Sequence, residues 1–404
     1  MMRKFFFLCF VCLSTVTALK AQWLWDSKDL AKVKANLHTP AYTAAYQALL
    51  AQADAALAKT SYSVTQKQSL APSGDVHDYV SLSRYWWPNP DTQDGLPYIN
   101  KDGLSNPELN NYDRNRLGNM ATAVNTLALA YYFSENETYA EKAALLLKTW
   151  FINADTKMNP NLEYAQFIPG MNGSKGRPEG LIDTYSFVHM LNSISFLKSS
   201  VYYDNALDAG LKTWFTQLTK WIKASDQGKK EDAAKNNHAT ALDAQLLTYY
   251  LFSEQHNLAV DILQNFLTRR VYTQIEPDGK QPHELWRTLA YHYSQYNLSH
   301  MLDVLQVADK IGLRLYAETS ADGRNVFKGL DFLALYLGKD VTSWPYKQIK
   351  DWDAKQQDVA FDLYRANRLD PTKTRYLDLF NRYSSMDAKD RRRLLYAIPC
   401  VAKE

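Results

Sequence analysis

The sequence predicts an all-α protein built as an incomplete α/α toroid, which is a barrel of antiparallel helix pairs. From Asn115 onwards, apolar residues recur at spacings of three and four, and few segments alternate with the period of a strand. Long loops rich in Gly and Pro separate some of the helical stretches, and no fixed-length repeat is present. Paired helices with unequal loops fit a toroid better than a repeat array or a four-helix bundle.

The N-terminus has the pattern of a secretory leader. Met1-Met2-Arg3-Lys4 precedes an apolar run that stops before Lys20-Ala21-Gln22. The run is too short for a membrane span, and no later stretch contains 18 successive apolar residues. We therefore expect residues 1–21 to be a signal peptide, residues 22–404 to form one catalytic domain, and the product to be periplasmic or extracellular.

The charge and the cysteine content limit which disulfides and which binding partners this protein can have. Cys9 and Cys12 lie in the leader, so Cys400 alone remains and no intramolecular disulfide can form. Without the three basic residues of the leader, the basic residues equal the 43 acidic ones in number. Nucleic acid is therefore not an expected partner, and an anionic ligand would need a local basic cleft. We also expect a monomer.

Residues 26–112 contain two short helical patterns and one long loop. Asp26-Ser27 begins the first helical pattern, and Pro40 opens a second that runs to about Leu57. Residues 60–112 carry repeated Pro and Gly without either period, which is uncommon inside a compact domain unless the segment is functional or disordered. Their aromatic residues argue against disorder. This stretch is predicted to be an ordered, aromatic-rich loop over a cleft.

Helices dominate the remainder, interrupted by a second Gly- and Pro-rich loop over residues 159–180. The apolar spacing predicts helices at residues 115–134, 137–150, 181–200, 204–224, 238–253, 256–270, 282–308, 326–338, 355–368 and 389–397. The 27 tyrosines and 10 tryptophans suit a protein that grips sugar rings, although they serve equally well as core residues.

Two polar motifs stand at predicted helix starts. In Lys235-Asn236-Asn237-His238, an Asn before a helix is most simply a cap. The histidine is not explained by capping. A first-turn imidazole near the positive end of the helix dipole is favoured in its neutral form, which makes His238 a candidate general base.

The second motif runs from Glu284 through Arg287 and Tyr293 to Leu298. Its tyrosines could be core residues, with Arg287 paired to Glu284 or Glu276. A set of Asn, His, Arg and Tyr also matches one reaction, the removal of a proton α to a carboxylate. That step needs donors to neutralise the carboxylate, a base for the proton and an acid for the leaving oxygen. In a polyuronate this is β-elimination. No histidine spacing indicates a metal, and neither metal nor cofactor is expected.

These motifs together resemble the alginate lyase superfamily of α/α-toroid polysaccharide lyases, with families 5 and 38 as the closest likeness. The resemblance covers roughly residues 80 to 300. It rests on three separated segments of the chain: Asn237-His238 with Glu284-Leu285-Trp286-Arg287 and Tyr293-Ser294; Ser83-Arg84-Tyr85-Trp86-Trp87-Pro88 through Asn106-Pro107-Glu108; and Gln166 with Pro169-Gly170.

The resemblance implies that Asn237 and Arg287 neutralise the substrate carboxylate. His238 would be the base and Tyr293 the acid, or Tyr293 would perform both steps with His238 assisting. Here six residues separate Arg287 from Tyr293, whereas family 5 has seven. On an ideal helix six residues place Tyr293 about 120° from Arg287, which leaves Tyr291 as a reserve candidate for the acid.

Further substrate contacts are expected from Tyr85, Trp86, Trp87, Gln166, Arg177, Asn236, Tyr291 and Glu284. The function predicted first is a secreted lyase that cleaves mannuronate-rich alginate or glucuronan. One alternative is an α/α-barrel glycoside hydrolase, which needs two carboxylates across the scissile bond, drawn from Asp183, Glu163, Glu179 and Glu284. The other is a glycan-binding helical protein of a sugar-uptake system.

Overall fold

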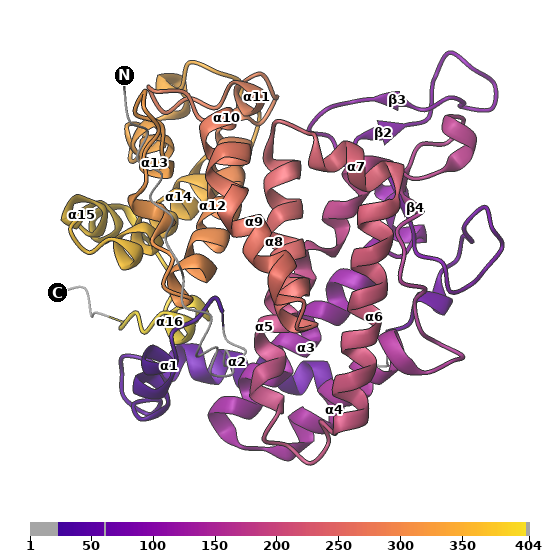
Figure 1. Ribbon diagram of the computed structural model, residues 1–404, viewed down its shortest axis with the longest axis horizontal. Coiled ribbons are helices and arrows are strands. Elements are labelled where there is room, and N and C mark those ends of the chain that lie inside the picture. The colour runs from indigo at the N-terminus through magenta and orange to yellow at the C-terminus, as the bar shows by residue number, and fades with distance from the viewer. Residues whose placement is uncertain (1–22, 60–61, 401–404) are drawn as a thin grey trace, which may run out of the picture.

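The computed structural model describes residues 23–59 and 62–400, and the predicted leader lies outside them. Five inner helices form a partial ring, and each packs against the next (Figure 1). In ring order they are α3 (Arg114–Ser134), α5 (Ser186–Leu197), α8 (Asn237–Phe252), α12 (Ala290–Lys310) and α14 (Trp352–Leu369). The predicted all-α toroid is confirmed.

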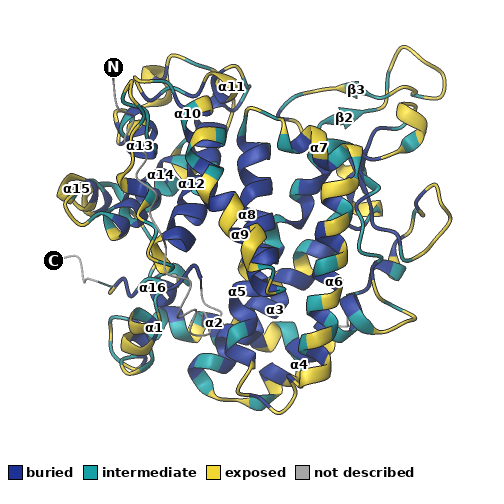
Figure 2. Cartoon of the chain, viewed as in Figure 1, coloured by how far each residue is buried: buried dark blue, intermediate teal, exposed yellow. Residues whose placement is uncertain are grey.

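Outer helices cover the inner ring. They are α2 (Thr43–Leu57), α4 (Glu137–Leu147), α6 (Asn205–Ala224), α9 (His256–Phe266), α13 (Val326–Ala334) and α15 (Thr374–Tyr383). The sequence pattern separates the two layers, because α8 is buried along nearly its whole length whereas α6 and α9 bury one stripe only (Figure 2). Between α14 and α3 lie α1 (Ser27–Lys34) and α16 (Arg392–Leu395), and α16 contacts both α1 and α2.

Three helical features differ from the sequence prediction. The predicted helix 282–308 is split into α11 (Pro282–Leu285) and α12, with a bend between them. Two helices, α7 (Asp226–Asp232) and α15, had no predicted counterpart. Short helical turns complete the chain: α10 (Tyr272–Gln274), η1 (Val64–Gln66), η2 (Pro107–Asn111), η3 (Lys148–Ile152), η4 (Asn172–Ser174), η5 (Pro178–Tyr185), η6 (Leu267–Val271), η7 (Leu315–Ala317) and η8 (Val341–Ser343).

The two predicted loops are ordered by four short strands. In Figure 1, β2, β3 and β4 lie on one side of the helices. Strand β1 (Val80–Leu82) pairs in parallel with β4 (Tyr164–Phe167), which joins the first loop to the second. Strands β2 (Trp86–Trp87) and β3 (Ile99–Asn100) form an antiparallel hairpin. The loops therefore form one connected rim above the inner helices.

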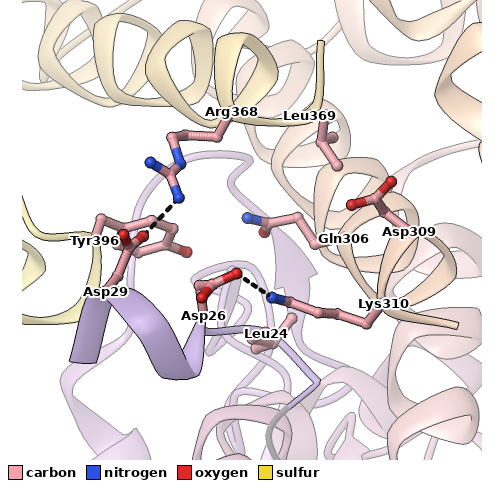
Figure 3. Close-up of a pocket in the computed structure, with 9 residues that line it drawn as sticks. All are labelled: Leu24, Asp26, Asp29, Gln306, Asp309, Lys310, Arg368, Leu369 and Tyr396. Carbon is pink, nitrogen blue, oxygen red and sulfur yellow. Dashed lines mark hydrogen bonds and ion pairs between the residues drawn. The ribbon is translucent and has the colours of Figure 1, made fainter. Parts of the chain in front are cut away.

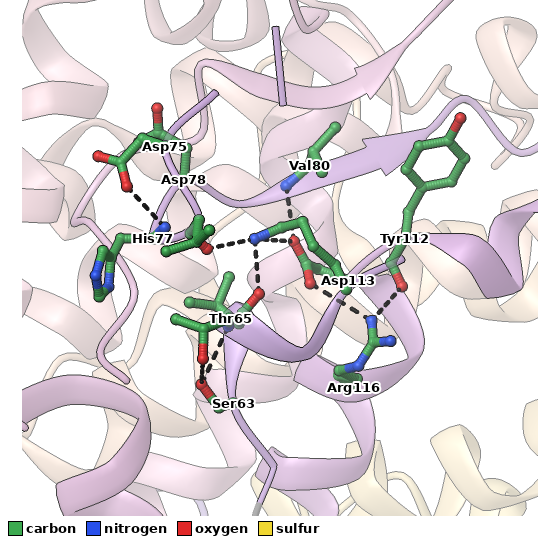
Figure 4. Close-up of polar contacts among 12 residues, drawn as sticks. Ser63, Thr65, Asp75, His77, Asp78, Val80, Tyr112, Asp113 and Arg116 are labelled. Carbon is green, nitrogen blue, oxygen red and sulfur yellow. Dashed lines mark hydrogen bonds and ion pairs between the residues drawn. The ribbon is translucent and has the colours of Figure 1, made fainter. Parts of the chain in front are cut away.

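A buried ion pair anchors the first loop to the start of α3 (Figure 4). The ammonium of Lys67 donates to the carbonyls of Val64 and Val76, both at 2.6 Å, and lies 3.3 Å from the carboxylate of Asp113. The backbone N–H of Val80 donates to Asp113 at 3.1 Å. Burial raises the pKa of Asp113 to about 6, although Lys67 opposes that shift. The pair fixes β1, whose neighbours support the cleft described below.

At the opposite side, helix α1 is held to the ring by two ion pairs around a small cavity of about 70 Å³ (Figure 3). Asp26 pairs with Lys310 of α12 at 2.8 Å, and Asp29 pairs with Arg368 of α14 at 2.6 Å.

Among the residues that the structure describes, no helix is both long enough and apolar enough to cross a bilayer.

Candidate active site

A cleft of about 450 Å³ opens beneath the loop rim, at the end of the toroid where α8 and α12 begin. The first loop, β4, the start of η5, the N-terminus of α8 and the α11–α12 bend all contribute to its walls. The structure brings most of the predicted site residues together there: Tyr85, Trp86, Gln166, Arg177, Asn236, Asn237, His238, Arg287 and Tyr293.

Helix α8 begins with a cap and a buried amide. The side chain of Asn236 caps the helix by accepting from the backbone N–H of His238 at 3.2 Å. Asn237 is fully buried, and its backbone N–H and side-chain Nδ2 both donate to the carboxylate of Glu284, at 2.5 to 3.1 Å. Burial raises the pKa of Glu284 to about 7, against the hydrogen bonds from Asn237. Glu284 therefore positions Asn237, and because Glu284 does not line the cleft its predicted substrate contact is wrong.

His238 has a carboxylate partner that the sequence did not reveal. Its Nδ1 lies 2.8 Å from Oε1 of the buried Glu231, which belongs to the unpredicted helix α7. Burial lowers the pKa of His238, but Glu231, Glu179 and Glu284 outweigh burial and leave the pKa above its ordinary value. The expectation that the helix dipole governs this imidazole is therefore wrong. With Nδ1 engaged, Nε2 is the ring nitrogen available to a ligand.

Arg287 and Tyr293 are stacked on one another. The guanidinium carbon of Arg287 lies 3.8 Å from the ring centre of Tyr293, and the Tyr293 hydroxyl lies 2.8 Å from that of Tyr85. Burial raises the pKa of Tyr293, and the cation of Arg287 acts in the opposite direction. Arg287 also donates through Nη2 to Asp102 at 2.8 Å, so its charge is shared with a carboxylate of the first loop.

Tyr291 does not belong to the cleft, so its predicted roles as a substrate contact and as the reserve acid are wrong. Its side chain is 0% exposed and packs against Trp344 and Trp352, with ring centres 5.1 and 4.6 Å apart. The chain bends between Arg287 and α12, so one continuous helical wheel does not relate Arg287 to the tyrosines. Within α12, positions two apart point to nearly opposite sides.

The bend has a clear structural cause. The backbone N–H and hydroxyl of Thr288 donate to Asp102, and Leu289 forms a β-bridge with Gln348. The N–H of Ala290 donates to the carbonyl of Lys347. These contacts with two distant segments replace the intrahelical bonds that a continuous helix would need.

Four further predicted contacts lie on the loop side. Arg177 donates to Ser83 at 2.7 Å and to Glu179 at 3.0 Å, and its guanidinium lies 5.7 Å from the ring centre of Trp86. Gln166 is nearly buried and donates to Asp183 at 2.9 Å. Trp87 does not line the cleft, because its indole N–H donates to the carbonyl of Leu104 and its ring faces Lys101. Trp87 supports the hairpin instead.

Several cleft residues were not predicted from the sequence. The lining also includes Arg84, Asn100, Asp102, Arg114, Trp286, His292 and Tyr296, together with Glu179, which the sequence suggested only as a hydrolase carboxylate. Arg84 follows Ser83 in the predicted motif and could have been included for that reason. Behind the wall, Asp183 accepts from Tyr79 and Ser81 and lies 3.3 Å from Arg114. Across residues 23–59 and 62–400, no three His, Cys, Asp or Glu side chains are grouped to hold a metal ion.

Comparison with known proteins identifies the family. The family model for alginate lyase matches residues 63–344. The crystal structure of an alginate lyase from Bacteroides ovatus superposes with a TM-score of 0.91 at 46% identity, over 93% of this chain and 98% of that one. Alginate lyase A1-III from Sphingomonas species A1 gives a TM-score of 0.59 at 15% identity, over 95% and 97%. No curated protein matches.

The fold and the cleft thus define a helical-toroid polysaccharide lyase. The chain belongs to the alginate lyase family.

Proposed function

We propose that this lyase cleaves a polyuronate, either mannuronate-rich alginate or glucuronan, by β-elimination and leaves 4,5-unsaturated uronate ends. The observation that carries the proposal is the meeting of a carboxylate-backed histidine, a tyrosine and an arginine in one cleft, from His238, Tyr293 and Arg287. The similarity to an alginate lyase from Bacteroides ovatus supports it. Alginate lyase A1-III also has a structure in complex with a tetrasaccharide.

His238 is the proposed base. The carboxylate of Glu231 at Nδ1 orients the ring and stabilises the imidazolium that forms when Nε2 accepts a proton. The proton removed is the one on C5 of the uronate. Its electron pair forms the C4=C5 double bond, and the bond from C4 to the glycosidic oxygen breaks.

Tyr293 is the proposed acid for the departing oxygen. Its raised pKa keeps the hydroxyl protonated before the reaction. Once the proton has moved to the leaving oxygen, Arg287 at 3.8 Å stabilises the tyrosinate. Transfer of the C5 proton from His238 back to Tyr293 through solvent restores both groups, so the reaction consumes no other reagent.

The carboxylate of the reacting sugar must be neutralised, because the carbanion would otherwise place a second negative charge beside it. Arg287 and the cleft arginines Arg84, Arg114 and Arg177 supply positive charge for this purpose. Three of the four are already paired, with Asp102, Asp183 and Glu179. Paired arginines hold their positions before substrate arrives and keep unused N–H donors for it.

A direct assay tests the proposal. The purified protein should produce ultraviolet absorbance from the conjugated product on polymannuronate, alginate or glucuronan, and His238→Ala should abolish it while polymer binding persists. Absence of absorbance on all three polymers would refute the proposal. A hydrolase would instead release saturated ends, and a binding protein would retain the polymer without shortening it.

The geometry gives the hydrolase alternative less support. Of the carboxylates proposed for a hydrolase, Asp183 and Glu284 are buried behind the wall, and Glu163 does not line the cleft. Glu179 lines it but is bound to Arg177.

We also propose export of the protein after cleavage of residues 1–21. N-terminal sequencing of the mature protein from its native compartment should begin at Gln22.

A further inference from the structure

The structure assigns to Trp286 a sugar-stacking subsite at the mouth of the cleft, for a uronate ring next to the one that is cleaved. This inference rests on the proposed polyuronate substrate. All ten tryptophans lie in the described part of the chain, and nine of them are buried or half-buried. Trp286 is 69% exposed, and it lines the cleft.

The exposure of Trp286 is imposed by the backbone on both sides of it. Leu285 before it and Leu289 after it are buried in the core. Between them, Thr288 is fixed by Asp102 and by the N–H of Ile349, which donates to its carbonyl at 3.2 Å. The segment therefore has no freedom to turn the indole inward. A rigid backbone and a side chain with only two rotatable bonds lose little entropy when a ligand covers the ring.

The positive charges next to the cleft tryptophans are complementary to the carboxylate of a uronate. The guanidinium of Arg287 lies 5.6 Å from the ring centre of Trp286, and across the same cleft Trp86 has Arg177 at 5.7 Å. In each pair an apolar ring can cover the C–H face of a pyranose while the adjacent cation attracts a uronate carboxylate, which for Arg287 is the carboxylate of the neighbouring, reacting sugar. A neutral sugar could stack on the ring but would offer no carboxylate to the cation.

The depth of the site separates this subsite from the reacting one. Asn237 is fully buried, Tyr293 nearly so, and the side chain of His238 is only 17% exposed. A sugar that contacts these groups lies at the base of the cleft. Trp286 is at the mouth, so it meets the next ring of the chain.

Steady-state kinetics on polymannuronate test the inference, with Leu258→Ala, at a 47% exposed apolar residue of α9, as the matched control. Trp286→Ala should raise KM for the polymer at least fivefold and leave kcat within twofold. Trp286→Phe keeps a stacking ring and should stay within twofold of the native protein. Leu258→Ala should match the native protein.

An unchanged polymer KM in Trp286→Ala would overturn the inference, and so would equal effects of the Ala and Phe substitutions. A binding measurement separates this inference from the proposed reaction. Titration with polymannuronate should change the tryptophan fluorescence of the native protein and of Leu258→Ala, and the change should be clearly smaller in Trp286→Ala. That result would support the subsite even if no polyuronate were cleaved, and an undiminished change would refute it.

Discussion

The imidazole of His238 and the carboxylate of Glu231 face each other at 2.8 Å across the junction of α7 and α8. Glu231 is buried beside the cleft, so this pair, with Glu179 and Glu284 nearby, decides the charge of the imidazole. The raised pKa keeps His238 protonated to a higher pH than an ordinary histidine. A base that must be neutral therefore loses activity as pH falls through a value above 6.5.

Replacing Glu231 by Gln tests this relationship. The favourable charge is removed while burial remains, so the pKa of His238 should fall, and the acidic limb of kcat/KM should move at least one pH unit lower. We expect kcat at pH 8 to drop by about 10²-fold, within the range of general base catalysis. Rates between pH 5 and 9 measure both effects, with the exposed Glu141→Gln as control. An unmoved limb would contradict the assignment, and activity that declines as pH rises through this pKa would make His238 a cationic donor.

The two tyrosines of α12 provide a matched pair. Tyr293→Phe removes the proposed acid and should lower kcat by about 10²- to 10⁴-fold, with KM changed much less. Tyr291→Phe removes a hydroxyl that donates to the carbonyl of Leu333 at 3.3 Å in the core. It should lower the free energy of unfolding by about 1 kcal/mol and leave kcat within twofold. The reverse ranking of the two kcat values would refute the placement of Tyr293.

Asp102 joins the β2–β3 hairpin to the opposite wall of the cleft through Arg287 and Thr288. Asp102→Asn weakens hydrogen bonds that involve charge, each about 1.5 to 3 kcal/mol, so backbone amides of residues 86–103 should exchange with solvent about tenfold faster. Hydrogen exchange measured by mass spectrometry reports this. Asp94→Asn, at an exposed site in the same hairpin, should leave exchange near the native rate. Equal protection in both variants would mean that Asp102 does not hold the hairpin.

Glu284 gives the stability a pH dependence of known sign. Its pKa is about 7 in the folded protein and 4.5 ordinarily, so between these values the folded state holds a proton that the unfolded state releases. This group therefore lowers the free energy of unfolding by about 3 kcal/mol as pH rises from 4.5 to 7. Glu284→Gln should remove that contribution. Urea unfolding at pH 5 and pH 8 measures it, with the partly exposed Glu276→Gln as control. A native-like pH dependence in Glu284→Gln would contradict the prediction.

The helical pattern in the sequence was sufficient to predict the toroid, because inner and outer helices differ in how many faces they bury. It also indicated the loops and most of the cleft. The bend after Leu285 could not be predicted, since the residues from Trp286 to Leu289 are compatible with a helix. It arises from Asp102 and from residues 347–349, which are distant in sequence.

The carboxylates behind the site were missed for the same reason. Glu231 lies in a short polar helix without an apolar stripe, and Asp102 lies in a loop. Each acquires its role only when folding brings it to His238 or Arg287. Trp87 and Tyr291 show the opposite error, because aromatic residues predicted for the cleft support its frame instead.

The bend also bears on how such proteins change over time. Arg287 precedes it and Tyr293 follows it, so each side chain is placed by contacts of its own rather than by helical register. The bend can accommodate an insertion or deletion of one residue without rotating α12 relative to the helices it packs against. An Arg-to-Tyr spacing of six in this chain and of seven in family 5 then describes the same site with connectors of different length. A sequence pattern used to search for such lyases should therefore allow a variable spacing between the Arg and the Tyr.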